Sequence, residues 1–523
     1  MHVCLLATEI ILHIISHIYG DHNGRAKRAT LAALARTCRK FKEPALDSLW
    51  KDITGFKPLI SCLPEGVSST NVRGGVTFNR PLSNSEWRLL DRYARRIHSF
   101  VVSAYNLDVL NDRVVQALIS APSATPLLSN LRSLVWCDNR ERFFPLLLTL
   151  FGSTITSMKL GSRSFPPTFA SSALLASLGA RCPSIRELDC TCRGDSEESS
   201  DVIVEALCGL QKLFHLETGV LHTRDLVRMA SLPSLKCMHF DLMKYDINET
   251  QLNSIPVNFS QLDEVRITSP SHSILYHCLK NIRCLSCRSL KIAINCDPFD
   301  DTPTVQLQLY GPLEIADVIS LSECFSPALE ELILELAYEF NDFNDEDILA
   351  NRRFALGFDV IAPLLSFSRL TDLRLDWICT SAIDDASLKT LAQSWPQLEI
   401  FYFGGFIPWL TPPSLTSIGF IHLIHHCPRL RSIQMSFRAC PVDINSETFS
   451  ETIPNENITI LSVGMSPIVD PIDVAYQLRG LLPKLTEVCF LEWRADEFCV
   501  PLAFEDYEDG WGRVNESLGV RCD

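Results

Sequence analysis

Four cysteines come nearest to a metal-ligand pattern in this chain: Cys278, Cys284, Cys287 and Cys296. Cys284 and Cys287 have the spacing that cysteine pairs adopt around structural zinc. Cys287, however, falls on an apolar position of a repeated pattern described below, and Cys278 lies in a segment with helical periodicity. A cysteine at such a position behaves as a small apolar side chain. We therefore expect no metal site, and zinc is the weaker alternative.

Two further polar groups could carry chemistry. The acidic segment 341–347 resembles a calcium loop, but it lacks the central glycine and a closing glutamate at the right distance, so a solvated insertion is expected instead. His422, His425 and His426 fall on one expected helix, where a division between core and surface is the usual outcome. We assign none of them a catalytic role.

Motifs of the common enzyme classes are absent from the sequence. It contains no phosphate-binding P-loop, dinucleotide glycine pattern, zinc-protease helix or kinase signature. The chain is therefore expected not to be an enzyme, with no catalytic residues, no cofactor and no metal. An enzyme would need a clustered polar pocket with perturbed titratable groups.

A short apolar pattern recurs from residue 97 onward. It consists of an apolar residue, two variable residues, an apolar residue, one variable residue and a further apolar residue; in one copy the last place is not apolar. Its copies begin at Ile97, Leu131, Ile155, Ile185, Leu213, Leu235, Leu262, Cys287, Leu329, Leu370, Leu398, Leu430, Ile458 and Leu485. Most starts are about 22 to 34 residues apart, which overlaps and extends the leucine-rich range. Alternation at the last two apolar places predicts one short strand per copy.

Segments with helical periodicity precede many of these strands. They cover residues 173–180, 202–210, 223–230, 274–280, 315–324, 358–366, 387–393, 418–426 and 474–481. Several end in a residue followed by proline, namely at Pro183, Pro396, Pro428 and Pro483. Because proline disfavours the helical conformation of its predecessor, each pair should stop the helix and release an extended segment. The unit is helix, turn, strand.

Stacked units of this kind predict a curved solenoid. Strands about 4.8 Å apart cannot match helices about 8 to 10 Å apart, so the stack must bend with its strands inside. The expected fold class is α/β, a horseshoe with parallel strands on the concave side and helices on the convex side. An ordinary doubly wound α/β domain is the alternative. This part resembles a leucine-rich-repeat domain of the irregular, long-repeat kind.

The outward strand positions would form the surface that a partner meets. In the central repeats they include acidic residues beside an aromatic ring, which suits a partner with basic features. We predict that a protein substrate binds at Glu331, Glu335, Asp372, Arg374, Asp376 and Tyr402. A solvated sheet face without a dedicated ligand is the alternative.

Charge and cysteine usage restrict the partners and the compartment. Lys plus Arg number 47 and Asp plus Glu number 62, giving a net charge of −15 that repels phosphate backbones, so no nucleic acid partner is expected. The 20 cysteines are scattered through apolar stretches, which indicates reduced thiols. Residues 3–18 lack the flanks of a signal peptide, and no segment is apolar enough to span a bilayer. An intracellular protein, cytoplasmic, nuclear or both, is expected.

Three short helices are expected within residues 6–53. Thr8 is a plausible N-cap for the first, which carries a wide isoleucine stripe from Ile10 to Ile18. The second covers about residues 28–36, and Pro44 suits the first turn of the third. A unit of this size rarely buries enough apolar surface to be stable alone. Its remaining exposed apolar side chains therefore predict a binding partner.

Residues through this segment match a known docking motif. They are Leu6, Glu9, Ile10, Ile14, Ile15, Ile18, Leu34, Cys38, Arg39, Phe41, Leu46, Leu49, Trp50 and Ile53. The segment resembles an F-box, and specifically that of fungal F-box proteins with leucine-rich repeats. The family usually has proline where this chain has Ala7, and the loop at residues 21–27 is longer than usual.

The resemblance implies a substrate receptor of an SCF-type, cullin-based ubiquitin ligase. In that family the F-box binds a Skp-type adaptor, and through it a cullin, while the repeats present a protein substrate. Carried over by position, the adaptor contacts are Leu6, Glu9, Ile10, Ile14, Leu34 and Leu46. The alternative is a cytosolic repeat scaffold or sensor whose first helices dock elsewhere.

Four regions are expected in the chain. They are an F-box-like helical domain at residues 1–55, a linker with a capping helix at 56–96, the repeat solenoid at 97–493 and a C-terminal cap with an acidic tail at 494–523. Within the second region, Ser83 and Glu86 have capping-box spacing. Trp87, Leu90 and Ala94 then fall on one helical face.

Overall fold

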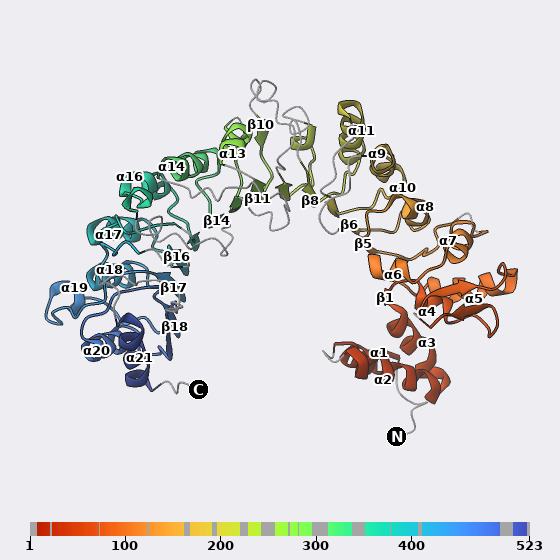
Figure 1. Ribbon diagram of the computed structural model, residues 1–523, viewed down its shortest axis with the longest axis horizontal. Coiled ribbons are helices and arrows are strands. Elements are labelled where there is room, and N and C mark those ends of the chain that lie inside the picture. Colours follow the sequence, from red (N-terminus) through yellow and green to blue (C-terminus); the bar gives the residue numbers. More distant parts are fainter. Residues whose placement is uncertain are drawn as a thin grey trace. The chain divides into compact units, whose positions relative to one another are not determined.

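The computed structural model divides into two compact units (Figure 1). The first is Met1–Gly219 with Leu232–Leu235, and the second is Val220–Ser231 with Lys236–Asp523. The structure describes residues 8–20, 24–72, 74–122, 125–161, 168–190, 196–219, 228–241, 257–269, 272–280, 282–294, 312–336, 351–376, 378–405, 410–491 and 506–519.

Three helices open the first unit: α1 (Thr8–Gly20), α2 (Gly24–Thr37) and α3 (Arg39–Trp50). Their apolar stripes meet in a small core. It consists of Ile11, Ile15, Leu31, Phe41 and Ala45. The three expected helices are therefore present, and each contributes buried side chains to one cluster.

The third helix begins earlier than its proline predicted. Cys38 has extended dihedral angles and caps α3, so Pro44 lies inside the helix rather than in its first turn. Proline lacks an N–H group and leaves a helical carbonyl without its usual donor. The helix continues past it because Phe41 and Ala45 on either side of Pro44 are buried in the core that the three helices share.

A parallel ladder of strands follows α3 in the first unit. Within the described residues it contains β1 (Asp52–Thr54), β4 (Ser99–Ser103), β5 (Ser133–Cys137), β6 (Ser157–Leu160), β7 (Glu187–Cys190) and β8 (His215–Thr218), in that order. The middle apolar residue of each repeat lies opposite that of the next, as for Phe100, Leu134 and Met158. β1 is an additional strand that the repeated pattern did not predict: Ile53 pairs with Phe100.

Helices and one hairpin connect these strands. They are α4 (Lys57–Ile60), β2 (Ser68–Thr70), β3 (Val76–Phe78), α5 (Asn84–Ala94), α6 (Ala104–Asp108), α7 (Asp112–Ile119), η2 (Glu141–Phe143), α8 (Phe144–Leu148), α9 (Phe169–Ala176), α10 (Leu178–Arg181) and α11 (Glu197–Cys208). The predicted capping box of α5 is confirmed, since Ser83 and Glu86 each bond the other's backbone N–H. Leu90 and Ala94 of α5 are buried.

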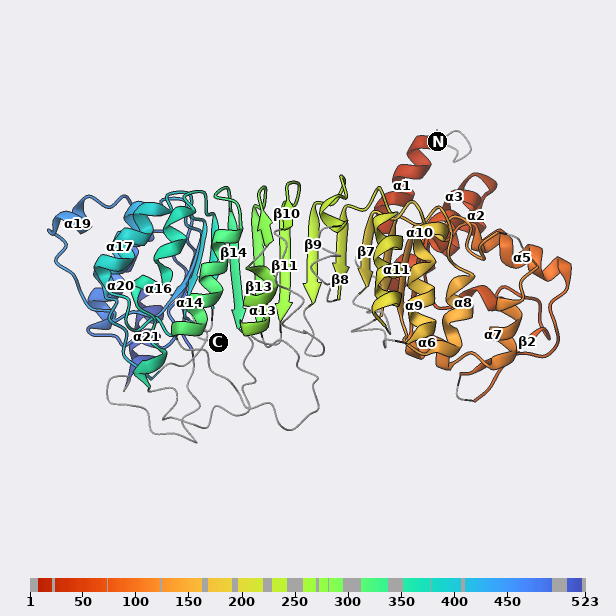
Figure 2. The same cartoon turned by 90° about the horizontal axis from the view of Figure 1, so that it is seen from above.

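The second unit contains the longer parallel ladder. Its described strands are β9 (Cys237–Asp241), β11 (Glu264–Ser269), β13 (Ser289–Ile294), β14 (Glu331–Leu336), β15 (Asp372–Leu375), β16 (Ile400–Phe403), β17 (Ser432–Met435), β18 (Ile460–Ser462) and β19 (Glu487–Cys489), in that order. Figure 2 shows β9, β11, β13 and β14 side by side. A separate parallel pair is formed by β10 (Val257–Phe259) and β12 (Ile282–Cys284). Leu373, Phe401 and Ile433 continue the register of middle apolar residues.

Helices of the second unit lie between the strands in sequence. They are α13 (His272–Leu279), α14 (Pro312–Ser320), η3 (Leu321–Cys324), η5 (Arg352–Phe354), α16 (Phe358–Ile361), η6 (Ala362–Ser366), α17 (Asp385–Ser394), α18 (Ser417–His426), α19 (Glu447–Ser450), α20 (Pro471–Leu481) and α21 (Tyr507–Leu518). Every helical segment that periodicity predicted here is present, except that most of residues 223–230 lies outside the described residues. The elements η5, α19 and α21 have no counterpart among those segments. None of the helices in the described part of the chain combines the length and apolar character needed to cross a membrane.

Residues that precede proline end their helices in one repeated geometry. Cys182, Trp395, Cys427 and Leu482 are the C-cap residues of α10, α17, α18 and α20, with φ between −117° and −128° and ψ between 54° and 75°. All four side chains are buried. Each thus stops a helix and fills the space between helix and strand, as the X-Pro pattern predicted.

The fold class is α/β, and it is the leucine-rich-repeat solenoid that the repeats predicted. Within each unit the parallel strands lie on one side and the helices on the other (Figure 1). The first, middle and last apolar residues of the repeats fill the layer between them; Leu370, Leu373 and Leu375 are all buried. The alternate residues of each strand are thereby left on the opposite face of the ladder.

Candidate protein-interaction surfaces

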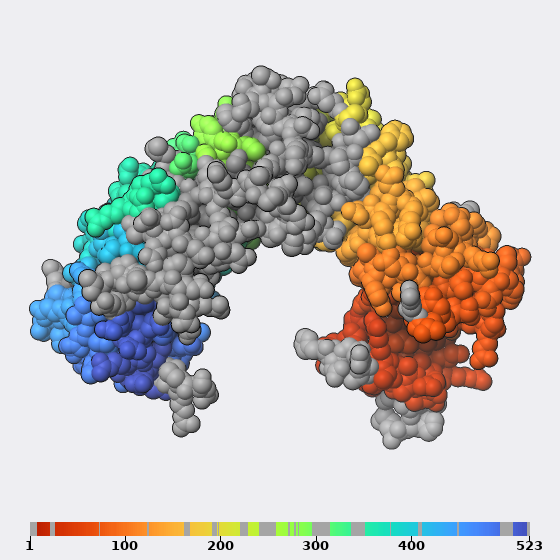
Figure 3. All heavy atoms as spheres, in the orientation of Figure 1, coloured from red at the N-terminus to blue at the C-terminus, as the bar shows by residue number. Residues whose placement is uncertain are grey.

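The first candidate surface is the outer side of α1, which is drawn with α2 and α3 in red in Figure 3. Ile11 and Ile15 point into the three-helix core and are 2% exposed. Ile10 is 48% exposed and Leu12 is 51% exposed. The three helices thus have a core of their own and still present two large apolar side chains to solvent. Leu12, two residues from Ile10, points to another side of the helix, so we call Glu9, Ile10 and Ile14 the α1 surface.

The six residues expected to contact an adaptor are not equally available. Glu9 and Ile10 are exposed, and Ile14 is half-buried. Leu34 and Leu46 are also half-buried, and Leu34 packs against the three-helix core. Leu6 lies outside the described residues. Among the described positions, α1 therefore offers the most open part of the expected docking surface.

Charged and aromatic contacts hold α3 to the start of the repeats. Arg96, which follows α5, bonds through its guanidinium to the carboxylates of Glu43 and Asp47 on α3. The Arg96 side chain is only 15% exposed, and the hydrogen bond and charge of Arg96 lower the pKa of Glu43. Beside them the rings of Trp50 and Tyr93 lie 4.8 Å apart. A protein docked on α1–α3 would thus be held at a defined place on the first unit.

The second candidate surface is the strand face of the second unit. In-register outward positions place Glu264, Glu331 and Asp372 in one row across β11, β14 and β15. Two residues further along the strands, a second row contains basic residues. We call the first set the acidic row and the second the basic row. The basic row consists of His239, Arg266, Lys291 and Arg374.

Ion pairs join the two rows. Lys291 Nζ lies 3.6 Å from Glu264 Oε1 and 3.4 Å from Glu331 Oε1. Arg374 donates two hydrogen bonds to Asp372, at 2.9 and 2.8 Å. The Arg374 guanidinium also lies over the Tyr402 ring, 5.0 Å from its centroid. Glu331 and Asp372 are therefore already paired within the protein, so this surface has mixed charge rather than the net acidic character that the sequence predicted.

Glu335 and Asp376 form the remaining part of the predicted substrate set. Both follow in register beyond the paired residues of β14 and β15. Glu335 is exposed, whereas Asp376 is 7% exposed, so the expectation of an open outward side chain is wrong for Asp376. Burial raises the pKa of Asp376 to about 7, with Glu335 and Asp372 adding to the rise against the charge of Arg374. Its Oδ1 has no hydrogen-bond partner.

The chain that follows β15 is also buried. Residues 378–381 are all buried, and the Ile378 carbonyl oxygen lies 2.7 Å from the place where a Cβ of residue 404 would stand. Gly404, which follows β16, has φ of +71°, and a side chain there would meet that backbone. The segment thus packs closely against the backbone after β16. Of the two outward positions, Asp376 is covered, whereas Glu335 on β14 remains accessible.

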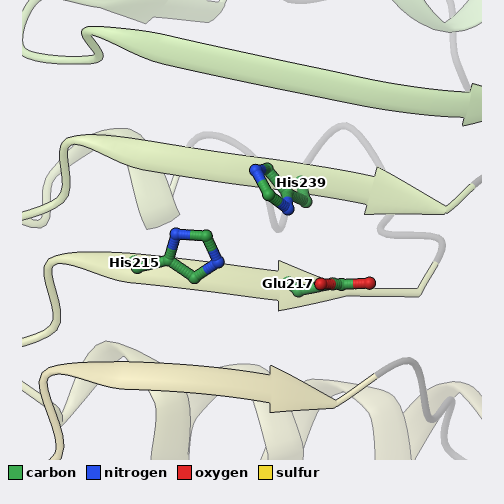
Figure 4. A group of neighbouring side chains, drawn as sticks. All are labelled: His215, Glu217 and His239. Atoms are coloured by element: carbon green, nitrogen blue, oxygen red, sulfur yellow. The ribbon is translucent and has the colours of Figure 1, made fainter. Parts of the chain in front are cut away.

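Sequence reasoning missed the charged residues of the preceding strands. Glu264, Arg266 and Lys291 occupy the same outward places of the repeat as Asp372 and Arg374, so the repeated pattern itself could have identified them. The same two-residue alternation is visible on β8 in the first unit. Figure 4 shows His215 and Glu217 there, two positions apart on one strand, and His239 on β9.

The cysteines considered as ligands have structural surroundings. Cys284 and Cys287 are buried, and burial raises the pKa of both thiols, that of Cys287 to about 12. The side chain of Cys278 and the whole of Cys296 lie outside the described residues, as does the acidic segment 341–347.

The expected division of the three α18 histidines between core and surface is not observed, since none of them is buried. His425 is exposed, and His422 and His426 are half-buried, with stacked rings whose centroids lie 6.2 Å apart. Burial lowers the pKa of His422 and His426. They therefore do not converge on a common point.

Comparisons with known proteins find similar folds at low identity. No protein family model and no curated protein matches the chain. A crystal structure of a Rad7–Elc1 complex from yeast matches at 15% identity and a TM-score of 0.34, covering 69% of this chain and 82% of that chain. An internalin, InlF, from Listeria monocytogenes matches at 14% and 0.31, covering 87% and 98%. The leucine-rich-repeat protein LegL7 from Legionella pneumophila matches at 12% and 0.25, covering 74% and 96%.

Proposed function

We propose that the chain is a substrate-recognition adaptor of an SCF-type cullin ubiquitin ligase. Helices α1–α3 dock on a Skp-type adaptor, and through it on a cullin, while the strand face of the second unit binds a protein substrate. The chain itself carries out no catalysis. The observation that carries this proposal is the exposure of Ile10 on the α1 surface, and of Leu12 close by on the same helix, although the three helices already share a core.

Docking through α1 is favoured by the position of the exposed apolar residues. Ile10 and Ile14 are four residues apart and so lie on one side of the helix. Their side chains are available without unfolding, because Ile11 and Ile15 supply the contacts to the core. A large apolar side chain at about half exposure gains free energy when a partner removes it from water, by about 1 kcal/mol or more per residue.

Substrate binding on the strand face is favoured by its mixed, ordered charges. Arg374 is held in place by Asp372 and Tyr402, so it loses little conformational freedom when a partner carboxylate approaches. Glu335 is exposed and can meet a basic side chain. We therefore propose a protein substrate with both acidic and basic groups, rather than a uniformly basic one.

Reduced thiols agree with an intracellular location in the cytoplasm, the nucleus or both. None of the cysteines whose side chains the structure describes forms a disulfide bond. Several are buried, and Cys427 donates weak hydrogen bonds to carbonyls at the end of α17. A reducing compartment would preserve these contacts.

Co-purification with a Skp-type adaptor tests the docking step. The unmodified chain is expected to retain the adaptor, and Ile10→Asp should abolish retention because a carboxylate cannot be buried in an apolar interface without a large desolvation cost. Ile472→Asp is the matched control: Ile472 is an isoleucine on α20 that is 69% exposed. It should leave retention unchanged.

Two outcomes would count against the proposal. Full retention by Ile10→Asp would remove α1 as the docking helix. Failure of the unmodified chain to bind any Skp-type adaptor would instead favour a repeat scaffold or sensor outside the ligase. Thermal unfolding of both variants checks that each remains folded, as expected for substitutions of exposed side chains.

A further inference from the structure

Two histidines lie one turn apart on the solvent side of α1. His13 and His17 are both exposed, and their Nε2 atoms are 3.1 Å apart. The rings meet nearly at right angles, at 85°, with centroids 4.6 Å apart. The two Nε2 atoms therefore face each other in a hydrogen bond, in which one ring donates and the other accepts.

This separation matches the distance between two ligands of one transition-metal ion. Imidazole nitrogens bind zinc at about 2.0 to 2.1 Å in tetrahedral geometry, which places two of them about 3.3 Å apart. The observed 3.1 Å differs from that value by an amount that a small side-chain rotation supplies. The α-helix fixes the spacing of the two Cα atoms, so the pair is organised before an ion arrives.

We propose that His13 and His17 form a binding site for a divalent transition-metal ion of the zinc, copper and nickel class. Neutral imidazole favours these ions over magnesium and calcium, which prefer oxygen ligands. Among the described residues of the first unit, no third potential ligand lies close enough to complete a group of three with this pair. The ion would therefore keep open positions for water or for a ligand from another molecule.

The site lies beside the α1 surface. On a helix with 3.6 residues per turn, His13 lies about one turn and His17 about two turns beyond Ile10, on the same side of α1. An ion held there would add a positive charge next to Glu9 and Ile10, so metal binding and protein docking on α1 would influence each other. The metal site itself does not depend on the identity of the docked protein.

Another histidine pair shows that sequence spacing alone is not sufficient. His422 and His426 on α18 are also four residues apart, but their rings are parallel and their centroids lie 6.2 Å apart. Both are half-buried. Only the α1 pair, of these two, is exposed with converging nitrogens.

Calorimetric titration of the full chain with ZnCl2 and with NiCl2 at neutral pH tests the proposal. The unmodified chain should bind one equivalent more than either His13→Ala or His17→Ala, or bind that equivalent at least about tenfold more tightly, because each variant removes one arm of the chelate. MgCl2 should give no binding at this site. His426→Ala, which alters the α18 pair, should retain the equivalent in full.

The site is absent if both His13→Ala and His17→Ala bind zinc and nickel with the stoichiometry and affinity of the unmodified chain. Loss of the same equivalent in His426→Ala would likewise overturn the assignment, since the ion would then belong to α18. Circular dichroism of each variant confirms folding, which exposed histidines should not affect. Adaptor retention by the variants is measured separately, so failure of docking and failure of metal binding are distinguishable.

Discussion

Asp376 is the titratable residue whose surroundings depart most from those of its neighbours on the strand face. The adjacent Asp372 has a bidentate arginine partner, whereas Oδ1 of Asp376 has no hydrogen bond and the residue is nearly fully buried. Because its folded-state pKa is raised to about 7, the native protein binds this proton more tightly than an unfolded chain, where an aspartate titrates near pH 3.9. The free energy of unfolding therefore has its largest contribution from Asp376 below about pH 4, where the carboxyl is protonated in both states. This contribution is lost as the pH rises through 7.

Replacing Asp376 with asparagine should remove this pH dependence. At pH 8 the free energy of unfolding of Asp376→Asn should exceed that of the unmodified chain by about 1 to 3 kcal/mol, and the raised pKa of Asp376 sets a ceiling of about 4 kcal/mol. At pH 5 the excess should be clearly smaller, because most of the loss of stability falls between pH 5 and pH 7. Urea denaturation at both pH values measures the difference.

Asp372→Asn is the matched control for this substitution. It lies on the same strand, but its carboxylate accepts two hydrogen bonds from Arg374, so its loss should destabilise the protein at pH 8. Equal destabilisation by Asp376→Asn at pH 5 and pH 8 would show that burial of the charged carboxylate is not what governs this position.

Among the elements, the contact between α3 and the end of α5 positions the docking helices. Arg96 bonds to two carboxylates of α3 across more than forty residues of sequence, while its neighbour Arg95 bonds only to Asp91 of its own helix. The Arg96 side chain is mostly buried, and that of Arg95 is 65% exposed. Arg96 therefore attaches α3 to the end of α5, whereas the adjacent Arg95 makes a contact only within its own helix.

Arg96→Gln should loosen α3 while Arg95→Gln should not. We expect Arg96→Gln to lower the stability of the α3 contact by about 1 to 2 kcal/mol, since it removes two charge-assisted hydrogen bonds. Hydrogen–deuterium exchange should become faster in α1–α3 and stay unchanged in β4 and β5. If both variants gave the same exchange in α3, the bonds of Arg96 would not be what attaches this helix.

At the scale of the whole molecule, a strand ladder needs its final edge covered. β19 is the last described strand, and Asn515 of α21 both accepts from the backbone N–H of Val488 and donates to its carbonyl, each at 2.9 Å. Trp511 and Val514 are completely buried, and Trp511 donates to the Ser466 carbonyl at 2.8 Å. α21 therefore satisfies polar groups that an open edge would offer to another chain.

Removal of residues 492–523 should cause self-association. The shortened chain would expose the edge of β19 together with the apolar surface that Trp511 covers. Sedimentation velocity should show concentration-dependent oligomers, whereas the full chain does not form them through this edge. Asn515→Leu in the full chain is the milder variant: it leaves two buried backbone groups of Val488 without partners and should cost about 2 to 4 kcal/mol. A monomeric shortened chain together with an unaffected Asn515→Leu would show that α21 is not needed to cap the ladder.

The sequence by itself determined the internal plan of the repeats. Inward positions such as Leu373 and Phe401 followed from alternation, and helix ends such as Cys427 followed from the proline after them. Both signals are local, because the side-chain direction along a strand and the effect of proline on its predecessor depend on adjacent residues alone. The predicted start of the third helix was wrong, because burial of the residues around Pro44 lets the helix continue through this proline. Strand β1 was not predicted, because Ile53 was placed in the helical segment.

Only the tertiary structure decided how the outward residues are used. Which carboxylate meets which cation depends on the neighbour and register of each strand, so the sequence could list Glu331 and Asp372 but could not show that Lys291 and Arg374 pair with them. The burial of Asp376 beside the exposed Glu335 is not encoded in their shared outward position, and the approach of His13 and His17 depends on their side-chain rotamers. These are relations across space, and no local pattern in the chain encodes them.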